Sequence, residues 1–240
     1  MIDIRGYIPS SMIDWPGRCV SMIFLPGCNF NCVYCHSGEL VHEWKKLPRW
    51  DLDDIIGRIN SNSNLIDGVV ISGGEPTIHK DLPELCEKIK VETDKPIKLN
   101  TNGANFQMLR WLTMNKLVDF VSMDVKTGLN REMYQELARY DDPKLVDEVK
   151  ASILLLKKSF SEHEFRITAF PPAIISDLRT SCLIPWLYGA NRVVVQQFNP
   201  DLAYDKTARR FMPLKIDTLV GFAKDITVYA NLKNDCEVRA

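Results

Sequence analysis

Short apolar runs recur along the chain, separated by longer segments in which apolar residues follow a helical spacing. The runs are rich in β-branched residues and mostly apolar on both faces, which is typical of strands in a buried parallel sheet. They span Cys19–Leu25, Val69–Ser72, Ile97–Leu99, Val118–Met123, Phe165–Ala169 and Val193–Gln197, with a weaker seventh run at Ile226–Tyr229.

The segments between the runs predict helices. Leu52–Ile59 and Leu82–Ile89 carry apolar residues at positions i, i+3, i+4 and i+7. Each follows an aspartate, Asp51 or Asp81, that is a candidate N-cap. Further stripes occupy Val146–Leu156 and Ile216–Ala223, and weaker ones Asn105–Lys116 and Ile174–Leu187.

The alternation of strand and helix, repeated about six times, predicts right-handed βαβ crossovers and therefore a parallel sheet. We expect an α/β fold in which this sheet curls into a full or partial barrel. An open, doubly wound sheet remains an alternative, because the order of strands in space cannot be read from the pattern alone.

Length and composition suit one globular domain with a substantial core: of 240 residues, 45% are hydrophobic and 25% charged. We expect a single domain over residues 1–240, with a core at about 18–200 and a C-terminal extension or lid at 201–240. The net charge of −1 gives no reason to expect nucleic acid or a membrane as partner. No apolar run approaches a membrane span and the N-terminus does not resemble a secretion signal, so we expect a soluble, cytoplasmic protein.

Polar or glycine-rich residues follow or end each of the main runs, always on the carboxyl side. They are Gly27–Cys35, Gly73–Pro76, Thr101–Gly103, Asp124 with Lys126, and Gln196 with Gln197, while Arg166 and Thr168 lie on the fifth run itself. Because α/β enzymes keep their active sites at the carboxyl edge of a parallel sheet, these residues predict one site at a common mouth. Gln196 and Gln197 point to opposite faces, so at most one of them reaches it.

Three of the seven cysteines, Cys28, Cys32 and Cys35, stand close together after the first strand run. The others are scattered and are expected as free thiols in a reducing compartment. Four thiolates would complete a tetrahedral zinc site or ligate every iron of a cluster, whereas here no second pair follows the triplet. The spacing therefore indicates a [4Fe–4S] cluster with one iron open to a substrate or cosubstrate, and a structural zinc knuckle is the alternative.

The triplet, with Tyr34 before its last cysteine, resembles the signature of the radical S-adenosylmethionine (SAM) superfamily, and Gly73–Pro76 resembles the second motif of that superfamily. The fold that this resemblance implies is a partial (β/α)6 parallel barrel. Within the superfamily the chain resembles the glycyl-radical-enzyme activases, most closely those of anaerobic ribonucleoside-triphosphate reductase. The matching segments read IDWPG, PGCNFNCVYCHSGEL, ISGGEPT, LNTNG, SMDVK, EFRIT and VVVQQFNP.

The resemblance implies two cofactors, a [4Fe–4S] cluster on the three cysteines and SAM at its open iron. The implied SAM-binding residues are Tyr34, Gly73, Gly74, Glu75, Asn102, Asp124, Lys126 and Arg166. Glu75 would accept a hydrogen bond from the amino group of SAM, and the two glycines would let backbone approach closely. Asn102 would bind a polar edge of SAM, Arg166 its carboxylate or ribose, and Tyr34 would pack near the adenine. No catalytic residue is implied beyond the cluster and SAM.

The implied activity is reductive cleavage of SAM followed by removal of hydrogen from one glycine of a large reductase. The implied partners are that glycyl-radical enzyme and a low-potential electron donor such as flavodoxin or ferredoxin. A compact radical enzyme acting on a small molecule, similar to 7-carboxy-7-deazaguanine synthase, is a second interpretation. A non-catalytic iron–sulfur or electron-transfer module is a third.

Several positions keep a second interpretation. Asp124 and Lys126 could form a simple ion pair at a strand end, and Arg166 could serve an internal salt bridge. Activases of pyruvate formate-lyase carry an aspartate where this chain has Asn100, so a monovalent cation site is in doubt. The polar segment Asn199–Arg210 is either a solvated loop or a lid or docking surface for the partner. In the second case its removal would abolish glycyl radical formation and leave cluster loading intact.

Overall fold

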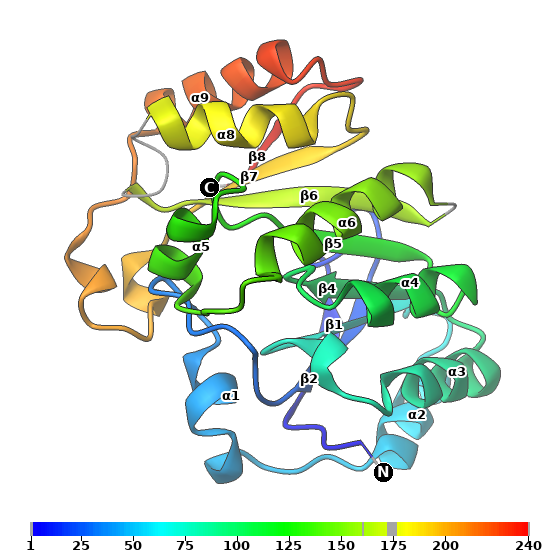
Figure 1. Cartoon of the computed structure of the whole chain (residues 1–240). Helices are drawn as coiled ribbons and strands as arrows, with labels where there is room; N and C mark the ends of the chain where they lie inside the picture. Colours follow the sequence, from blue (N-terminus) through cyan, green and yellow to red (C-terminus); the bar gives the residue numbers. More distant parts are fainter. Residues whose placement is uncertain (1, 160, 172–176, 240) are drawn as a thin grey trace.

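A single curved sheet organises the molecule, as the computed structural model in Figure 1 shows; it describes residues 2–159, 161–171 and 177–239. The strands are β1 (Gly6–Ser11), β2 (Val20–Leu25), β3 (Gly68–Gly73), β4 (Ile97–Thr101), β5 (Phe120–Asp124), β6 (Glu162–Ala169), β7 (Val193–Gln197) and β8 (Glu237–Arg239). The α-helices are α1 (Gly38–His42), α2 (Leu52–Ser61), α3 (Leu82–Thr93), α4 (Phe106–Met114), α5 (Arg131–Ala138), α6 (Leu145–Lys158), α8 (Asp177–Leu187) and α9 (Ile216–Tyr229). Short 3₁₀ helices are η1 (Trp44–Lys46), η2 (Pro76–Ile78), η3 (Pro200–Leu202) and η4 (Ala208–Arg210).

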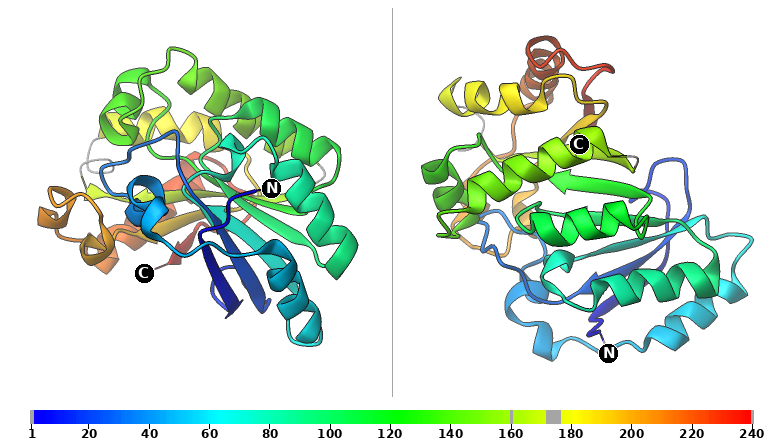
Figure 2. Two further views of the ribbon diagram at one scale, coloured as in Figure 1. Left: turned by 90° about the horizontal axis from the view of Figure 1, so that it is seen from below. Right: turned by 45° about the vertical axis from the view of Figure 1, so that its right-hand side comes forward.

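The strand order decides between barrel and doubly wound sheet. The order in space runs from β1 to β8 without reversal; β1 is antiparallel to β2, and every later neighbour is parallel. A doubly wound sheet needs a point where the order reverses, so the structure is the partial barrel. Its helices lie on the outer face, as Figure 2 shows, and β1 and β8 remain as the two unjoined ends.

The six main runs form β2 to β7, as predicted, but the weak seventh run does not form a strand. Ile226–Tyr229 is the last turn of α9, because its apolar residue Ile226 continues the buried helical face of Leu219 and Ala223. Tyr229 of the same run is 65% exposed. The seventh parallel position is taken by β8, at the C-terminus.

Capping explains one of the predicted helix starts. Asp51 accepts hydrogen bonds from the backbone N–H groups of Asp53 and Asp54 at 2.9 and 3.2 Å, so α2 begins where the sequence predicted. The helix predicted over Ile174–Leu187 corresponds to α8, although the start of that prediction lies outside the described residues.

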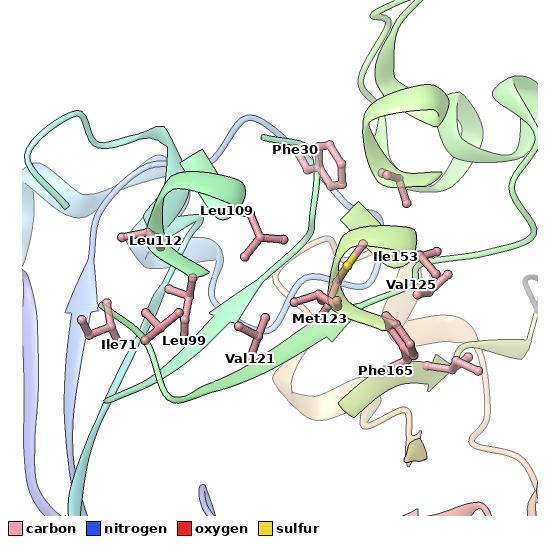
Figure 3. Packing of buried hydrophobic residues seen from close by; sticks show 14 of the residues in the cluster. Phe30, Ile71, Leu99, Leu109, Leu112, Val121, Met123, Val125, Ile153 and Phe165 are labelled. Atoms are coloured by element: carbon pink, nitrogen blue, oxygen red, sulfur yellow. The ribbon is translucent and has the colours of Figure 1, made fainter. Parts of the chain in front are cut away.

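The main hydrophobic core lies between the outer face of the sheet and the helices. Figure 3 shows strand residues such as Leu99, Val121 and Phe165 packed against Leu109 of α4 and Ile153 of α6. All five side chains are fully buried. This layer fixes the positions of the strand ends, since each strand is held to the helix that follows it.

The inner face of the middle strands is polar, so the expectation that the strands are apolar on both faces was wrong there. A small apolar cluster of Trp15, Met22 and Phe120 fills the lower end of the barrel. Above it lies the buried carboxylate of Glu164, which receives a hydrogen bond from Lys98 Nζ at 3.3 Å. These inward charges are buried and paired with each other, and they do not line the cavity at the carboxyl edge of the sheet. Within the described part of the chain, no helix combines the length and hydropathy that a membrane crossing requires.

Candidate functional site

A cavity of about 370 Å³ lies at the carboxyl edge of the sheet. The strand register brings the strand ends level there: Leu25 pairs with Gly73, and Asp124 with Arg166. All the site residues predicted from sequence line this cavity. They are Cys28, Cys32, Tyr34, Cys35, Gly73, Gly74, Glu75, Asn102, Asp124, Lys126 and Arg166. The structure thus brings the whole predicted set together, while the role of each residue stays a prediction.

The three cysteines lie on the loop between β2 and α1, within the cavity wall. Burial raises the pKa of Cys28 to about 12 and that of Cys32 to about 11, and it also raises the pKa of Cys35. Such thiols stay protonated at neutral pH unless a metal takes the place of the proton. The Sγ atom of Cys28 also accepts a hydrogen bond from the backbone N–H of Phe30 at 3.2 Å.

The spread of the thiols bears on which metal they fit. Among the residues that the structure describes, no three His, Cys, Asp or Glu side chains converge closely enough to share one ion. A tetrahedral zinc site needs such convergence, whereas the irons of a cluster are bound one thiolate each. Three thiolates on one loop match the donor set of a cluster that leaves one iron without a protein ligand.

Backbone hydrogen bonds fasten the cysteine loop to two neighbouring elements. The N–H of Asn31 donates to the carbonyl of Ala138 at the end of α5, at 2.8 Å. The N–H of Glu75, after β3, donates to the carbonyl of Gly27 at 2.8 Å. A ligand loop held in this way keeps its thiols in place before metal arrives, which lowers the ordering cost of binding.

Gly73 and Gly74 let the end of β3 touch the start of the cysteine loop. A Cβ atom on Gly73 would lie 2.1 Å from the carbonyl oxygen of Leu25, and Gly73 has a φ of +131°. A Cβ atom on Gly74 would lie 1.8 Å from the carbonyl oxygen of Gly27. Neither position tolerates a side chain, so the glycines are required by this contact whatever else binds there.

The carboxylate of Glu75, in the second motif, accepts hydrogen bonds from two segments of the chain. Its Oε1 accepts hydrogen bonds from Thr101 Oγ1 at 2.7 Å and from Thr77 Oγ1 at 2.6 Å. Its Oε2 accepts one from the backbone N–H of Asn102 at 2.6 Å. Burial raises the pKa of Glu75, although these donors oppose the shift. The carboxylate therefore joins the ends of β3 and β4, and Oε2 retains capacity for one further donor.

Asp124, Lys126 and Arg166 form a compact charged group on the opposite wall. Lys126 Nζ lies 2.8 Å from one carboxylate oxygen of Asp124, and Arg166 Nε lies 2.8 Å from the other. Burial would raise the pKa of Asp124, but the two cations outweigh it and hold the pKa at about 2. The group carries one net positive charge at neutral pH, which suits an anionic part of a ligand.

Asn102 and Tyr34 contact the cysteine loop and the charged group. Asn102 Nδ2 donates to Asn29 Oδ1 at 2.8 Å, so its side chain lies against the loop. The hydroxyl of Tyr34 donates to the backbone carbonyl of Lys126 at 3.3 Å, and its ring packs against Phe170. Both side chains are thereby fixed at the cavity wall.

The two glutamines divide as the strand geometry predicted. Gln196 lines the cavity. Gln197 points the other way, and its Nε2 donates to the backbone carbonyl of Leu214 at 2.7 Å. Gln196 is therefore the glutamine whose side chain reaches the predicted mouth.

Asn100, at the position that bears on a monovalent cation site, presents both a donor and an acceptor oxygen without a hydrogen-bond partner within the described ranges. The amide Nδ2 of Asn100 donates to Ser72 Oγ at 3.1 Å, so a donor stands on this side of the cavity. Both oxygens of Asp124 already receive Lys126 and Arg166.

Sequence reasoning missed one carboxylate in the cavity, Asp14. Asp14 follows β1, the antiparallel strand that the sequence pattern did not indicate. Ser11 Oγ donates to its carboxylate, and Lys98 Nζ donates to its backbone carbonyl at 2.8 Å. The only available signal was its place in the matching segment IDWPG, which by itself assigns no position in space.

Residues 198–211 (orange in Figure 1) pack against the cysteine loop on a third side. The backbone N–H of Tyr204 donates to the carbonyl of Cys35 at 2.9 Å. Asp205 forms an ion pair at 2.8 Å with Arg139, the residue that ends α5. This segment, predicted to be either a solvated loop or a lid, is packed against the cysteine loop.

Comparisons with known proteins agree with these features. Residues 22–181 match the radical SAM superfamily. A protein of Methanocaldococcus jannaschii, provisionally named a glycyl-radical enzyme activating enzyme, is 30% identical over 86% of this chain and 84% of its own length. A provisionally named GTP 3′,8-cyclase of Methanococcus maripaludis is 37% identical over 50% of this chain and 40% of its own. The crystal structure of a radical SAM methyltransferase from Sphaerobacter thermophilus covers 94% of this chain and 67% of its own, with a TM-score of 0.66 and 15% identity, a likeness of fold.

Proposed function

Because the chain belongs to the radical SAM superfamily, we propose that it generates a glycyl radical on a large partner enzyme, an anaerobic ribonucleoside-triphosphate reductase. The similarity to the Methanocaldococcus protein, which extends over 86% of the chain, supports the activase part of this proposal. The choice of reductase rests on the matching sequence segments given above. The cyclase relative matches only 50% of the chain, and this chain spans 40% of the length of that relative. The activase interpretation therefore accounts for more of the molecule.

The cofactors of the superfamily are a [4Fe–4S] cluster and SAM, and the cavity residues fit both. When both cofactors are bound, the one-electron cleavage of SAM supplies the chemistry that removes a hydrogen atom from carbon. The protein contributes binding and orientation. Cys28, Cys32 and Cys35, which all line the cavity, would hold the cluster.

The remaining cavity residues would place SAM against the cluster. The net positive group of Asp124, Lys126 and Arg166 would receive the carboxylate or ribose of SAM. The free side of Glu75 Oε2 would accept a hydrogen bond from the amino group of SAM. Asn102 and Tyr34 are both fixed by contacts to neighbouring backbone or side chains. Asn102 would contact a polar edge of SAM, and Tyr34 would pack near its adenine.

The cavity charges favour a protein substrate over a nucleoside triphosphate. Besides the group around Asp124, the wall holds two further carboxylates, Asp14 and Glu75. A triphosphate carries several negative charges, whereas the group of Asp124, Lys126 and Arg166 offers only one net positive charge. A glycine of a protein loop brings no charge to the reacting position and meets no such conflict.

The reducing electron would come from a low-potential donor such as flavodoxin or ferredoxin.

The test is anaerobic reconstitution of the protein, followed by addition of dithionite, SAM and a candidate reductase. We expect release of 5′-deoxyadenosine and a glycyl radical doublet on the reductase by electron paramagnetic resonance. A Cys32→Ala variant, which loses one cluster ligand, should give neither signal. Release of 5′-deoxyadenosine without a radical on the reductase would support a small-molecule substrate. No release by the wild-type protein would support a non-catalytic electron-transfer module.

A further inference from the structure

A second cavity, of about 530 Å³, lies beside the candidate site. We propose that this cavity is the groove through which an extended, glycine-containing segment of the partner enzyme reaches the cluster. This inference rests on the proposed function and adds the surface by which the partner is recognised. The groove lies between the start of β1, at Arg5 and Gly6, and the segment from Asp201 to Arg209.

The groove is continuous with the candidate site. His36 and Ser37, which follow the last cysteine of the triplet, line both cavities. Phe24 of β2 also lines the groove, and the sheet is not closed between β1 and β8. A chain lying in the groove would therefore pass directly alongside Cys35, where the cavity that binds the cofactors begins.

The charges of the groove suit an uncharged polypeptide. Two arginines, Arg5 and Arg209, are balanced by two carboxylates, Glu39 and Asp201. Arg5 is already engaged, since its Nε donates to Asp3 at 2.9 Å and its Nη1 to a backbone carbonyl at 3.0 Å. A phosphate-bearing ligand would need free cations, so this balance favours backbone amides over a nucleotide.

The apolar part of the groove offers places for side chains of the segment. Leu40, Leu47 and Leu202 line it, and Leu202 is 57% exposed at its rim. Exposed apolar residues beside a groove are typical of surfaces that bind another chain. An extended segment with one small residue near the cluster fits this groove. Its side chains could contact the leucines, and its uncharged backbone suits the balanced charges of the lining.

The test fills the groove without touching the cofactor site. Leu202→Trp places a bulky ring at the rim, and Val91→Trp on α3, where Val91 is 78% exposed, is the matched control. Both variants should bind a full cluster and release 5′-deoxyadenosine with dithionite and SAM as the wild type does. With the reductase added, we expect at least a tenfold lower kcat/KM for radical formation in Leu202→Trp and less than a twofold change in Val91→Trp. Equal kcat/KM values for the two variants would overturn the groove assignment.

A second measurement does not depend on activity. With the photoreactive amino acid p-benzoylphenylalanine at position 202, irradiation should cross-link the protein to the reductase within about ten residues of its radical-bearing glycine, since extended chain spans about 3.3 Å per residue. The same label at position 91 should give no such product. Cross-links only elsewhere on the reductase would reject the groove. If the wild-type protein forms no radical on the reductase, the proposed function itself fails, which is a different outcome.

Discussion

At the scale of single residues, the glycines of the second motif show how strongly local contacts constrain the site. Gly73 and Gly74 are needed because backbone from β2 and from the cysteine loop occupies the space where their side chains would be. Glu75, next in sequence, is held by donors from two other segments. The motif is thus a structural joint between β3, β4 and the cysteine loop, as well as a candidate part of the SAM site.

Gly74→Ala tests this joint. The new methyl group would lie 1.8 Å from the carbonyl oxygen of Gly27, so the cysteine loop must move away from β3. We expect the purified variant to retain less than about a tenth of the wild-type iron and sulfide after anaerobic reconstitution, because a displaced ligand loop loses the preorganisation that metal binding needs. Metal analysis and absorbance of the cluster provide the measurement.

Gly57→Ala is the matched control for this prediction. Gly57 lies inside α2 with nothing within 4 Å of its added Cβ. Alanine should leave cluster content unchanged and raise the free energy of unfolding by about 0.5–1 kcal/mol, through helix propensity. If the Gly74→Ala protein bound as much iron as the Gly57→Ala protein, the contact between the end of β3 and the cysteine loop would not matter for cluster binding.

At the scale of elements, the cysteine loop is held by three parts of the chain that are distant in sequence. The end of α5 binds it through Ala138, the end of β3 through Glu75, and the 198–211 segment through Tyr204. The sequence predicts that cluster loading survives removal of Asn199–Arg210. The contact of Tyr204 with the loop that carries the thiols leads us to a different prediction.

Gly38→Ala separates the 198–211 segment from the loop with one methyl group. A Cβ atom on Gly38 would lie 2.0 Å from the ring of Tyr204, which now stacks on His42. Displacing the ring should break the hydrogen bond from the Tyr204 N–H to the Cys35 carbonyl. We expect the reconstituted variant to lose iron to a strong chelator about tenfold faster than wild type, a change of about 1.4 kcal/mol in the barrier.

The control for Gly38→Ala is Gly221→Ala in α9, where nothing lies within 4 Å of the added Cβ. Its rate of iron loss should equal that of the wild type. Equal rates in all three proteins would mean that the segment covers the loop without contributing to cluster retention.

At the scale of the whole molecule, a buried charge network joins the C-terminal strand to the middle of the barrel. Glu164 of β6 is fully buried, and its Oε2 accepts a hydrogen bond from Arg239 of β8 at 3.1 Å. Its Oε1 accepts hydrogen bonds from Ser122 and from Lys98. Burial would raise the pKa of Glu164, but Lys98, Ser122 and Arg239 hold it at about 2. The last residues of the chain thereby stabilise the centre of the sheet.

This network predicts acid sensitivity of the metal-free protein. Because the pKa of Glu164 is lower in the folded state, its contribution is present above the unfolded pKa of about 4.3 and is lost as the pH falls toward 2. We expect the free energy of unfolding to fall by up to about 3 kcal/mol from this group over that range. Urea unfolding at several pH values measures it.

Glu164→Gln provides the comparison. The variant should be less stable at pH 7, since Lys98 and Arg239 lose their buried partner, but its stability should depend less on pH between 5 and 2. A wild-type protein and a variant with parallel pH profiles would show that Glu164 does not carry this dependence.

The sequence by itself determined the periodic elements and the candidate site. Six of the strands, the alternation with helices and the strand-end positions of the site residues follow from local patterns, because strand and helix periods and strand ends are local properties. The cysteine spacing and the second motif likewise indicated the donor set. All of the predicted site residues line one cavity because parallel strands present their carboxyl ends on the same edge.

Only the tertiary structure decided how these pieces are arranged. Strand order, the antiparallel β1 with Asp14, and the short β8 in place of Ile226–Tyr229 depend on pairing between residues far apart in sequence. The burial of Glu164 and the cover that residues 198–211 place on the cysteine loop are contacts of the same kind. Such contacts leave no periodic trace in the chain, because each depends on packing and charge pairing that exist only once the whole chain has folded.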